Sequence, residues 1–167
     1  MRLLYIIFII ILSTPCYITS KDGLHQKIKH KLSDLGYVKI KLYKNEFDMF
    51  ELPARINNKE IRLLLTPHKY ITIFNKRYID LLGLDYYDTK IEVNYGGDTD
   101  FLSITTVDSL VIGSVVIRSF DVKTVEFMNF AVFSDLFVEG MIGKEFLIKY
   151  NAIIDYGNEF LYLKGET

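Results

Sequence analysis

Residues 52–65 read Leu52-Pro-Ala-Arg-Ile-Asn-Asn-Lys-Glu-Ile-Arg-Leu-Leu-Leu65. Apolar and polar residues alternate on both sides of Asn57-Asn58-Lys59, and asparagine is favoured in tight hairpin turns. This pattern predicts a β-hairpin with strands over Phe50–Ile56 and Glu60–Leu65. The run Thr66-Pro67-His68-Lys69-Tyr70 then breaks the alternation and predicts a loop.

Short strands separated by turn residues continue on both sides of this hairpin. The other expected strands are Tyr37–Tyr43, Lys90–Tyr95, Phe101–Val107, Ser109–Ile112, Val115–Ile117, Phe120–Val125, Ala152–Asp155 and Phe160–Leu163. Three short helices are expected: Leu24–Leu35 ended by Gly36, a helix capped by Asn75 that runs to Leu82 before Gly83, and Lys144–Tyr150. Phe127–Val138 is apolar without a clear period. The pattern as a whole predicts a mainly β domain, either a barrel or a sandwich.

Composition limits the classes of function. The 167 residues are 50% hydrophobic and 25% charged, which favours one globular domain with short additions. The net charge of −1 gives no electrostatic reason to expect nucleic acid binding. Cys16 is the single cysteine and lies in the N-terminal apolar run. Removal of that run would leave no thiol for disulfides, zinc–thiolate sites or cysteine catalysis, and we expect no cofactor and no metal.

The N-terminus has the parts of a secretory signal. Arg2 precedes the unbroken apolar run Leu3–Leu12, and Ser13, Thr14 and Pro15 end that run. We expect a signal peptide over residues 1–20 and export to the periplasm or the extracellular space. Two alternatives stay open: an uncleaved anchor through residues 3–19, which would be the chain's contact with the membrane, and lipidation at Cys16, which Pro15 disfavours. An N-terminal helix and lead-in strand are expected over residues 21–49, followed by a β domain over residues 50–164.

Three stretches, taken in order, resemble the retropepsin-like aspartic proteases in their bacterial single-domain form. The first is Leu52–Leu65 with Ile71–Phe74 and the helix end Leu81-Leu-Gly-Leu84. The second is Val107-Asp-Ser-Leu-Val-Ile-Gly113 with Val115–Phe120. The third is Glu139-Gly-Met-Ile-Gly-Lys-Glu-Phe-Leu147 with Ala152-Ile-Ile-Asp-Tyr-Gly157. The resemblance covers roughly Phe50–Lys164 and implies a small closed barrel with short helices.

The resemblance also implies a site that this sequence does not complete. Chains of this family each supply one aspartate from an Asp-Thr/Ser-Gly loop, and two copies pair about a two-fold axis. The paired carboxylates share a proton and activate water. Thr66-Pro67-His68 occupies the expected position of that loop, so no carboxylate is available there. We therefore expect an inactive protein, with no catalytic residue in this loop.

Several residues are candidates for a peptide-binding groove. Four of them are Tyr70 after the loop and Met141, Ile142 and Gly143 in the third stretch. The others lie in the expected hairpin that resembles the family's flap, which closes on the substrate in active relatives: Tyr95, Gly96, Gly97 and Asp98. His68 has no carboxylate at metal-ligand spacing, so we interpret it as a solvent-facing loop histidine. The expected function is that of a non-catalytic module that binds a peptide or protein, with a homodimer implied by the fold. The alternatives are an aspartic endopeptidase that uses a carboxylate from a partner or from Asp98 or Asp100, and a membrane-tethered structural protein.

Overall fold

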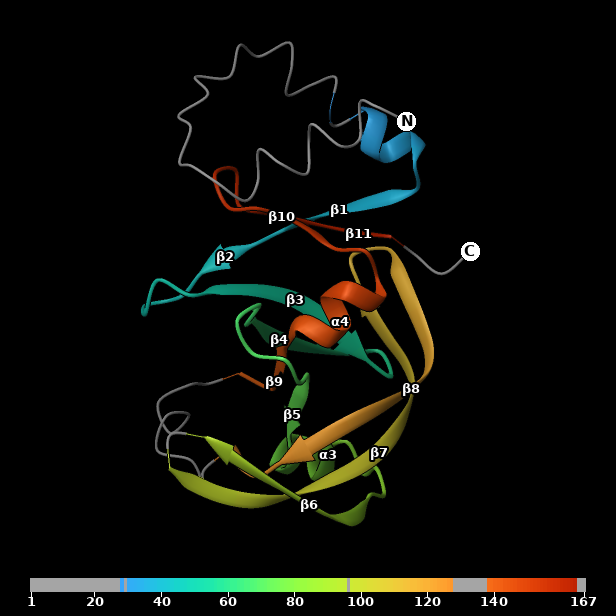
Figure 1. The fold of residues 1–167 in the computed structure, drawn as a ribbon. Helices are drawn as coiled ribbons and strands as arrows, with labels where there is room; N and C mark the ends of the chain where they lie inside the picture. The colour runs from blue at the N-terminus through green and yellow to red at the C-terminus, as the bar shows by residue number, and fades with distance from the viewer. Residues whose placement is uncertain (1–27, 29, 96, 128–137, 165–167) are drawn as a thin grey trace. The chain divides into compact units, whose positions relative to one another are not determined.

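A closed ring of six strands organises the fold. The computed structural model describes residues 28, 30–95, 97–127 and 138–164. The ring runs through β3, β4, β9, β5, β8 and β7 and returns to β3 (Figure 1). These strands are β3 Phe50–Ile56, β4 Lys59–Leu65, β5 Ile73–Asn75, β7 Asp98–Ile112, β8 Val115–Val125 and β9 Gly140–Ile142. Pairing of residues 54–56 with residues 110–112 closes the ring, and the predicted closed barrel is confirmed.

The chain divides into two units, Met1–Leu32 and Ser33–Thr167. In the first unit, the described residues Ile28 and 30–32 are helical. Of the helix expected over Leu24–Leu35, the described residues 28 and 30–34 are helical, and Leu35 lies in the turn that follows. In the second unit, Gly36 has φ +81 and donates its N–H to the Ser33 carbonyl at 2.9 Å, as a helix-ending glycine does. The signal peptide expected over residues 1–20 lies outside the described residues.

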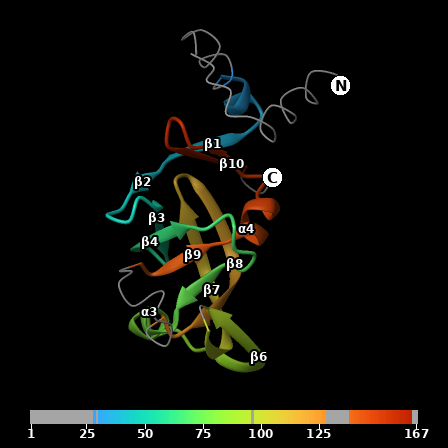
Figure 2. The ribbon, with the colours of Figure 1, turned by 60° about the vertical axis from the view of Figure 1, so that its left-hand side comes forward.

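Five further strands and two helices make up the rest of the second unit where the structure describes it. β2 Tyr43–Lys44 and β6 Tyr87–Tyr95 extend the ring sheet at its two ends. β1 Tyr37–Lys41, β10 Ile153–Asp155 and β11 Phe160–Lys164 form a separate three-stranded sheet in the order β1-β11-β10. Two short helices, α3 Lys76–Leu81 and α4 Lys144–Lys149, follow β5 and β9 (Figure 2). β1, which precedes the boundary expected at residue 50, pairs along its whole length with β11.

The expected strand Tyr37–Tyr43 is wrong as a single strand, because the chain passes from one sheet to the other at Leu42. Leu42 is fully buried, and its N–H donates to the Glu159 carbonyl at 2.9 Å. β2 after it pairs with β3, in the ring sheet. Alternation continues through both pieces, so a period-2 pattern alone does not reveal the change of partner.

The breaks expected inside the long hairpin are also wrong. Residues 98–112 form one strand and residues 115–125 form another, joined at Gly113-Ser114. Asp108 is an exposed residue in the middle of β7, where one face of the strand meets solvent. Ser119 in β8 adopts φ +47 without ending the strand. Polar residues at these positions mark the outer face of a continuous strand.

Local signals in the sequence correspond to local geometry. Asn57 and Asn58 have φ of 46° and 68°, which is the turn that their type favours between β3 and β4. The Asn75 side chain accepts from the Arg77 N–H and caps α3. Gly83, with φ +68, follows the end of that helix. The turns and the short helix that lead into and out of the loop after β4 are therefore fixed locally.

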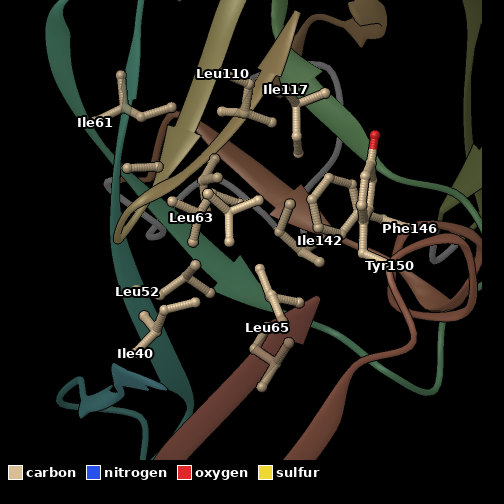
Figure 3. Packing of buried hydrophobic residues seen from close by; sticks show 14 of the residues in the cluster. Ile40, Leu52, Ile61, Leu63, Leu65, Leu110, Ile117, Ile142, Phe146 and Tyr150 are labelled. Carbon is tan, nitrogen blue, oxygen red and sulfur yellow. The ribbon is translucent and has the colours of Figure 1, made fainter. Parts of the chain in front are cut away.

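Alternation along β4 and β9 divides the apolar residues between two clusters. Leu63, Leu65 and Ile142 point into the main core, together with Phe146 and Tyr150 from the segment around α4 (Figure 3). Leu64 and Met141 lie on the opposite face, in a second cluster. The remaining described members of that buried second cluster are Ile73, Val93, Leu102, Val125, Phe127 and Val138. The expected hairpin strands around Gly96-Gly97 thus pack on the outer face of the β4–β9 pair.

Candidate functional site

The loop after β4 begins with a threonine whose hydroxyl is hydrogen-bonded within the protein. Thr66 is 5% exposed. Its N–H and its Oγ1 both donate to the Ile142 carbonyl, at 2.9 Å and 3.0 Å. Its own carbonyl accepts from the Lys69 N–H at 3.0 Å, which closes a turn over Pro67 and His68. The loop therefore presents a buried and hydrogen-bonded hydroxyl at the position where the family resemblance implies an aspartate.

The rest of the loop is bound to the start of α4 through hydrogen bonds that backbone N–H groups donate. The Lys144 N–H donates to the Lys69 carbonyl at 2.7 Å, and the Glu145 N–H donates to the Tyr70 carbonyl at 2.9 Å. The Gly143 N–H donates to Thr72 Oγ1 at 2.9 Å. These bonds hold residues 69–72 alongside residues 143–145 over their whole length.

Gly143 is required because the loop backbone at Tyr70 and Ile71 lies so close to the start of α4. Its φ of −93° and ψ of 179° are open to any residue. A Cβ at this position would lie 2.3 Å from the Ile71 carbonyl oxygen and 2.7 Å from the Tyr70 carbonyl oxygen. Because the obstructing atoms are backbone, no side-chain rotation relieves the contact. The second glycine of the Gly140-Met-Ile-Gly143 stretch therefore serves the packing of the loop against the helix.

Glu145 is a carboxylate bonded to the loop, and both of its oxygens are engaged. Lys123 Nζ donates to Oε1 and Oε2 at 2.8 Å and 2.6 Å. The Thr72 N–H also donates to Oε1, at 2.8 Å. Glu145 is therefore a structural anchor that ties β8 and the loop to α4.

The hairpin β6–β7 is anchored at its base by three polar side chains. Lys76 Nζ donates to Asp88 Oδ1 at 3.0 Å and to Ser103 Oγ at 3.1 Å. Ser103 Oγ donates to Asp88 Oδ1 at 2.6 Å. The hydrogen bond from Ser103, followed by the hydrogen bond and charge of Lys76, holds the pKa of Asp88 below its ordinary value of 3.8. The carboxylate form of Asp88 thus helps to fix the hairpin to the beginning of α3.

The groove candidates from the sequence lie in different surroundings. Tyr70 is 66% exposed, while Ile142 is fully buried in the main core and Met141 is buried in the second cluster. Gly97 has φ +99 in the turn between β6 and β7, next to the half-buried Asp98. Tyr95 is the last residue of β6, and Gly96 lies outside the described residues. Of the eight, Tyr70 is the one whose described side chain is largely open to solvent.

Neither carboxylate considered as a borrowed acid lies in the loop after β4. Asp100 Oδ1 accepts from the Phe101 N–H at 2.7 Å, and its Oδ2 accepts from the Glu126 N–H at 3.3 Å. These bonds tie Asp100 to the junction between β7 and the end of β8. Asp98 pairs in register with Tyr95 at the tip of the hairpin.

Two features escaped the sequence analysis. Val93 and Leu102 attach the hairpin to the second cluster, and the alternation along residues 90–107 is a signal that could have indicated their inward direction. A hollow of about 200 Å³ also opens between β8 and α4. Its lining residues are Thr72, Phe74, Phe120, Asp121, Val122, Lys123, Glu145, Phe146 and Lys149. No local pattern in the sequence predicts this hollow, because its walls come from three separate segments.

Within the described residues, no three His, Cys, Asp or Glu side chains come close enough together to hold a metal ion. The same part of the chain contains no helix that is both long and apolar enough to cross a membrane.

The closed ring, the loop bound to α4 and the long hairpin together define a class of fold, the retropepsin-like fold. The structure resembles the crystal structure of a retropepsin-like aspartic protease from Rickettsia conorii, with a TM-score of 0.54 and 20% identity over 77% of this chain and 89% of that chain. The retroviral protease-like domain of Ddi1 from Leishmania major is also similar, with a TM-score of 0.48 and 18% identity over 69% of this chain and 87% of that chain. No family model matches the sequence, and no curated protein matches it. The predicted retropepsin-like fold is confirmed.

Proposed function

We propose that this protein is a non-catalytic retropepsin-like domain that is exported and binds a peptide or a protein. The observation that carries the proposal is the hydrogen bonding of Thr66 at the position where an acid protease has an aspartate. Its hydroxyl donates to the Ile142 carbonyl within the chain, and no carboxylate is present between Thr66 and Thr72. Export is supported by the signal-like sequence over residues 1–20.

The chemistry of acid proteases explains why this replacement matters. Two adjacent carboxylates share one proton, so that one accepts a proton from water while the other donates to the substrate carbonyl. A threonine hydroxyl does not ionise near neutral pH and cannot replace either carboxylate. A dimer of this chain would place two threonines, and no acid, at that position.

Peptide binding is supported by β6, which within the described part of the chain has a strand on one side only. This nine-residue strand is the last in the order of its sheet, and it pairs with β7. Tyr87 and Ile91 on β6 are 63% and 56% exposed, and Phe101 on β7 is 58% exposed. An edge strand with exposed apolar side chains can accept an extended peptide as an additional strand, with main-chain hydrogen bonds providing affinity.

Peptide cleavage by the purified full-length chain provides the first test. A mixed peptide library is incubated with the protein between pH 3 and pH 8, and products are identified by mass spectrometry. We expect no cleavage above the level of a buffer control. Cleavage in the acid range that disappears in Asp98→Asn or Asp100→Asn would overturn the proposal and indicate a borrowed carboxylate.

Peptide binding at the β6 edge provides the second test. We expect Ile91→Lys to weaken binding of extended library peptides, because a charge on an edge strand opposes the addition of another strand. Val116→Lys is a matched control, since Val116 is 44% exposed on β8 and pairs with Val111 of β7, beyond the β7 residues with which β6 pairs. Equal binding by both variants and the unmodified protein would remove the β6 edge from the proposal.

A further inference from the structure

The hollow between β8 and α4 reaches the apolar interior of the protein. Three of its lining residues, Phe74, Val122 and Phe146, are at most 2% exposed. They belong to β5, β8 and α4, so each of the three segments around the hollow contributes an apolar side chain to its wall. The lining lies outside β6 and β7, and the hollow is therefore separate from the β6 edge.

The volume of the hollow, about 200 Å³, limits what it can hold. Sites for drug-sized ligands occupy about 300–1,000 Å³. An engineered apolar cavity of about 150 Å³ in another protein binds benzene. The hollow therefore has room for one six-membered ring with a small substituent, and it excludes a larger molecule.

Two aromatic side chains form part of the wall. The Phe120 and Phe146 rings have centroids 6.0 Å apart and an interplanar angle of 90°. The Phe146 ring also packs on Tyr150, with centroids 4.6 Å apart. Aromatic rings attract one another in edge-to-face and offset arrangements at such separations, and a third ring can join a pair in the same way. These side chains favour an aromatic ring over an aliphatic group of equal size.

Four charged residues line the hollow, and their charges cancel. Lys123 and Lys149 carry one positive charge each, and Asp121 and Glu145 carry one negative charge each. Lys123 Nζ lies 2.6 Å from Glu145 Oε2, so these two groups neutralise each other directly. Asp121 Oδ1 accepts from Thr106 Oγ1 at 2.7 Å. An ion would find little compensation here for its lost hydration, so the favoured occupant is neutral.

Thr72 provides a hydrogen-bond donor at the hollow. It lines the hollow and is 4% exposed. Its Oγ1 accepts from the Gly143 N–H at 2.9 Å, and a hydroxyl that accepts in this way still has one proton to donate. Among the described residues, no acceptor takes that proton. A buried donor without an acceptor costs free energy, which an oxygen atom on the occupant of the hollow would recover.

We infer that the hollow binds a neutral aromatic ring that carries one hydrogen-bond-accepting oxygen, as a phenol does. The ring contacts Phe120 and Phe146, and the oxygen accepts from Thr72 Oγ1. A phenol group occurs both in free small molecules and in the side chain of tyrosine, so the ring has two possible sources. This site goes beyond the proposed function, because it requires neither the β6 edge nor the absence of catalysis.

The first measurement is a titration of the full-length, isotope-labelled chain with p-cresol, followed by two-dimensional NMR. We expect saturable shifts at residues 120–123 and 145–149, with a Kd of about 1 mM or below for a ligand of this size. We expect p-methylbenzoate, which is charged, and methylcyclohexanol, which lacks the aromatic ring, to bind at least about fivefold more weakly. Absence of saturation by p-cresol up to about 10 mM, or equal binding of all three probes, would overturn the inference.

Variants of Thr72 test the hydrogen bond to the occupant. Thr72→Val removes the hydroxyl at nearly constant shape and should weaken p-cresol binding at least about fivefold. Toluene, which has no oxygen, should bind this variant within about twofold of its affinity for the unmodified protein. Thr72→Ser retains the hydroxyl and should retain the affinity for p-cresol within about threefold. Equal losses of p-cresol and toluene binding in Thr72→Val would show that Thr72 only shapes the hollow, and would overturn the inferred oxygen contact.

The aromatic wall is tested by one variant and a matched control. Phe120→Leu removes a ring from the wall and should weaken binding of both p-cresol and toluene at least about threefold. Phe101→Leu makes the same change at a 58% exposed residue of β7 outside the lining, and it should alter binding by less than about twofold. Circular dichroism verifies that both variants are folded. Equal losses in the two variants, or no loss in Phe120→Leu, would overturn the inference.

A five-residue peptide with a central tyrosine between glycines identifies the source of the ring. Competition with p-cresol at equal or lower concentration would support the inference with a tyrosine side chain as the occupant. Saturable p-cresol binding without competition by the peptide would support it with a free phenol as the occupant. Ile91→Lys should leave p-cresol binding unchanged, so a failure of peptide binding at the β6 edge can be told apart from a failure of this inference.

Discussion

Replacement of Gly143 by alanine is the most direct test of how the loop and α4 fit together. The backbone conformation at Gly143 accepts alanine without strain, so the effect comes from the added Cβ alone. That atom would lie 2.3 Å from the Ile71 carbonyl oxygen and 2.5 Å from its carbonyl carbon. Relief of this overlap requires a shift of the loop backbone relative to α4.

The cost follows from the contacts that such a shift disturbs. Overpacking in a well-packed region costs about 1–3 kcal/mol. The three hydrogen bonds that join residues 69–72 to residues 143–145, at 2.7–2.9 Å, contribute about 1 kcal/mol each when fully lost. A partial loss of these bonds added to overpacking gives about 3 kcal/mol. For a chain of this size, the midpoint of thermal unfolding should fall by about 6–12 °C.

Equilibrium unfolding in urea and thermal unfolding, both followed by circular dichroism, measure this change. Gly157→Ala is the matched control, because a Cβ there meets only Asp155 Oδ1 at 3.7 Å. We expect the control to change stability by less than about 0.5 kcal/mol. A Gly143→Ala variant as stable as Gly157→Ala would refute the close packing of the loop on α4.

Three other predictions test the site and the hairpin. Thr66→Val should lower the free energy of unfolding in urea by about 1 kcal/mol, through loss of the buried hydroxyl's hydrogen bond, and an unchanged value would contradict that bond. Hydrogen bonds from Ser103 and Lys76 lower the pKa of Asp88 in the folded protein. Its carboxylate therefore stabilises the protein above pH 3.8, and this contribution is lost as the pH falls through the lowered pKa. Asp88→Asn should be less stable than the unmodified protein at pH 5, and the difference should vanish in strong acid. Val93→Ser should lower the free energy of unfolding by about 2 kcal/mol, measured by thermal unfolding. Ile91 lies two residues away and is exposed, so Ile91→Ser should change stability by less than about 0.5 kcal/mol. Similar losses of stability in both variants would argue against the second cluster.

The sequence by itself determined the local elements and the chemistry of the loop. Asparagines 57 and 58 set the turn of the first hairpin through their tolerance of positive φ, and Asn75 caps α3 through its own side chain. The absence of an acid between Thr66 and Thr72 is also a property of the sequence alone. Each of these depends on residues within a few positions of one another, so no knowledge of distant partners is needed.

Only the tertiary structure decided which strands pair and what the loop contacts. The parallel pairing of β4 with β9 joins residues 63–65 to residues 140–142, and the closure of the ring joins β3 to β7. Alternation fixes which side chains share a face of a strand but does not say what covers that face. For that reason three features appear only once segments far apart in the chain are brought together. These are the second cluster, the overlap that excludes a side chain at Gly143, and the hollow between β8 and α4.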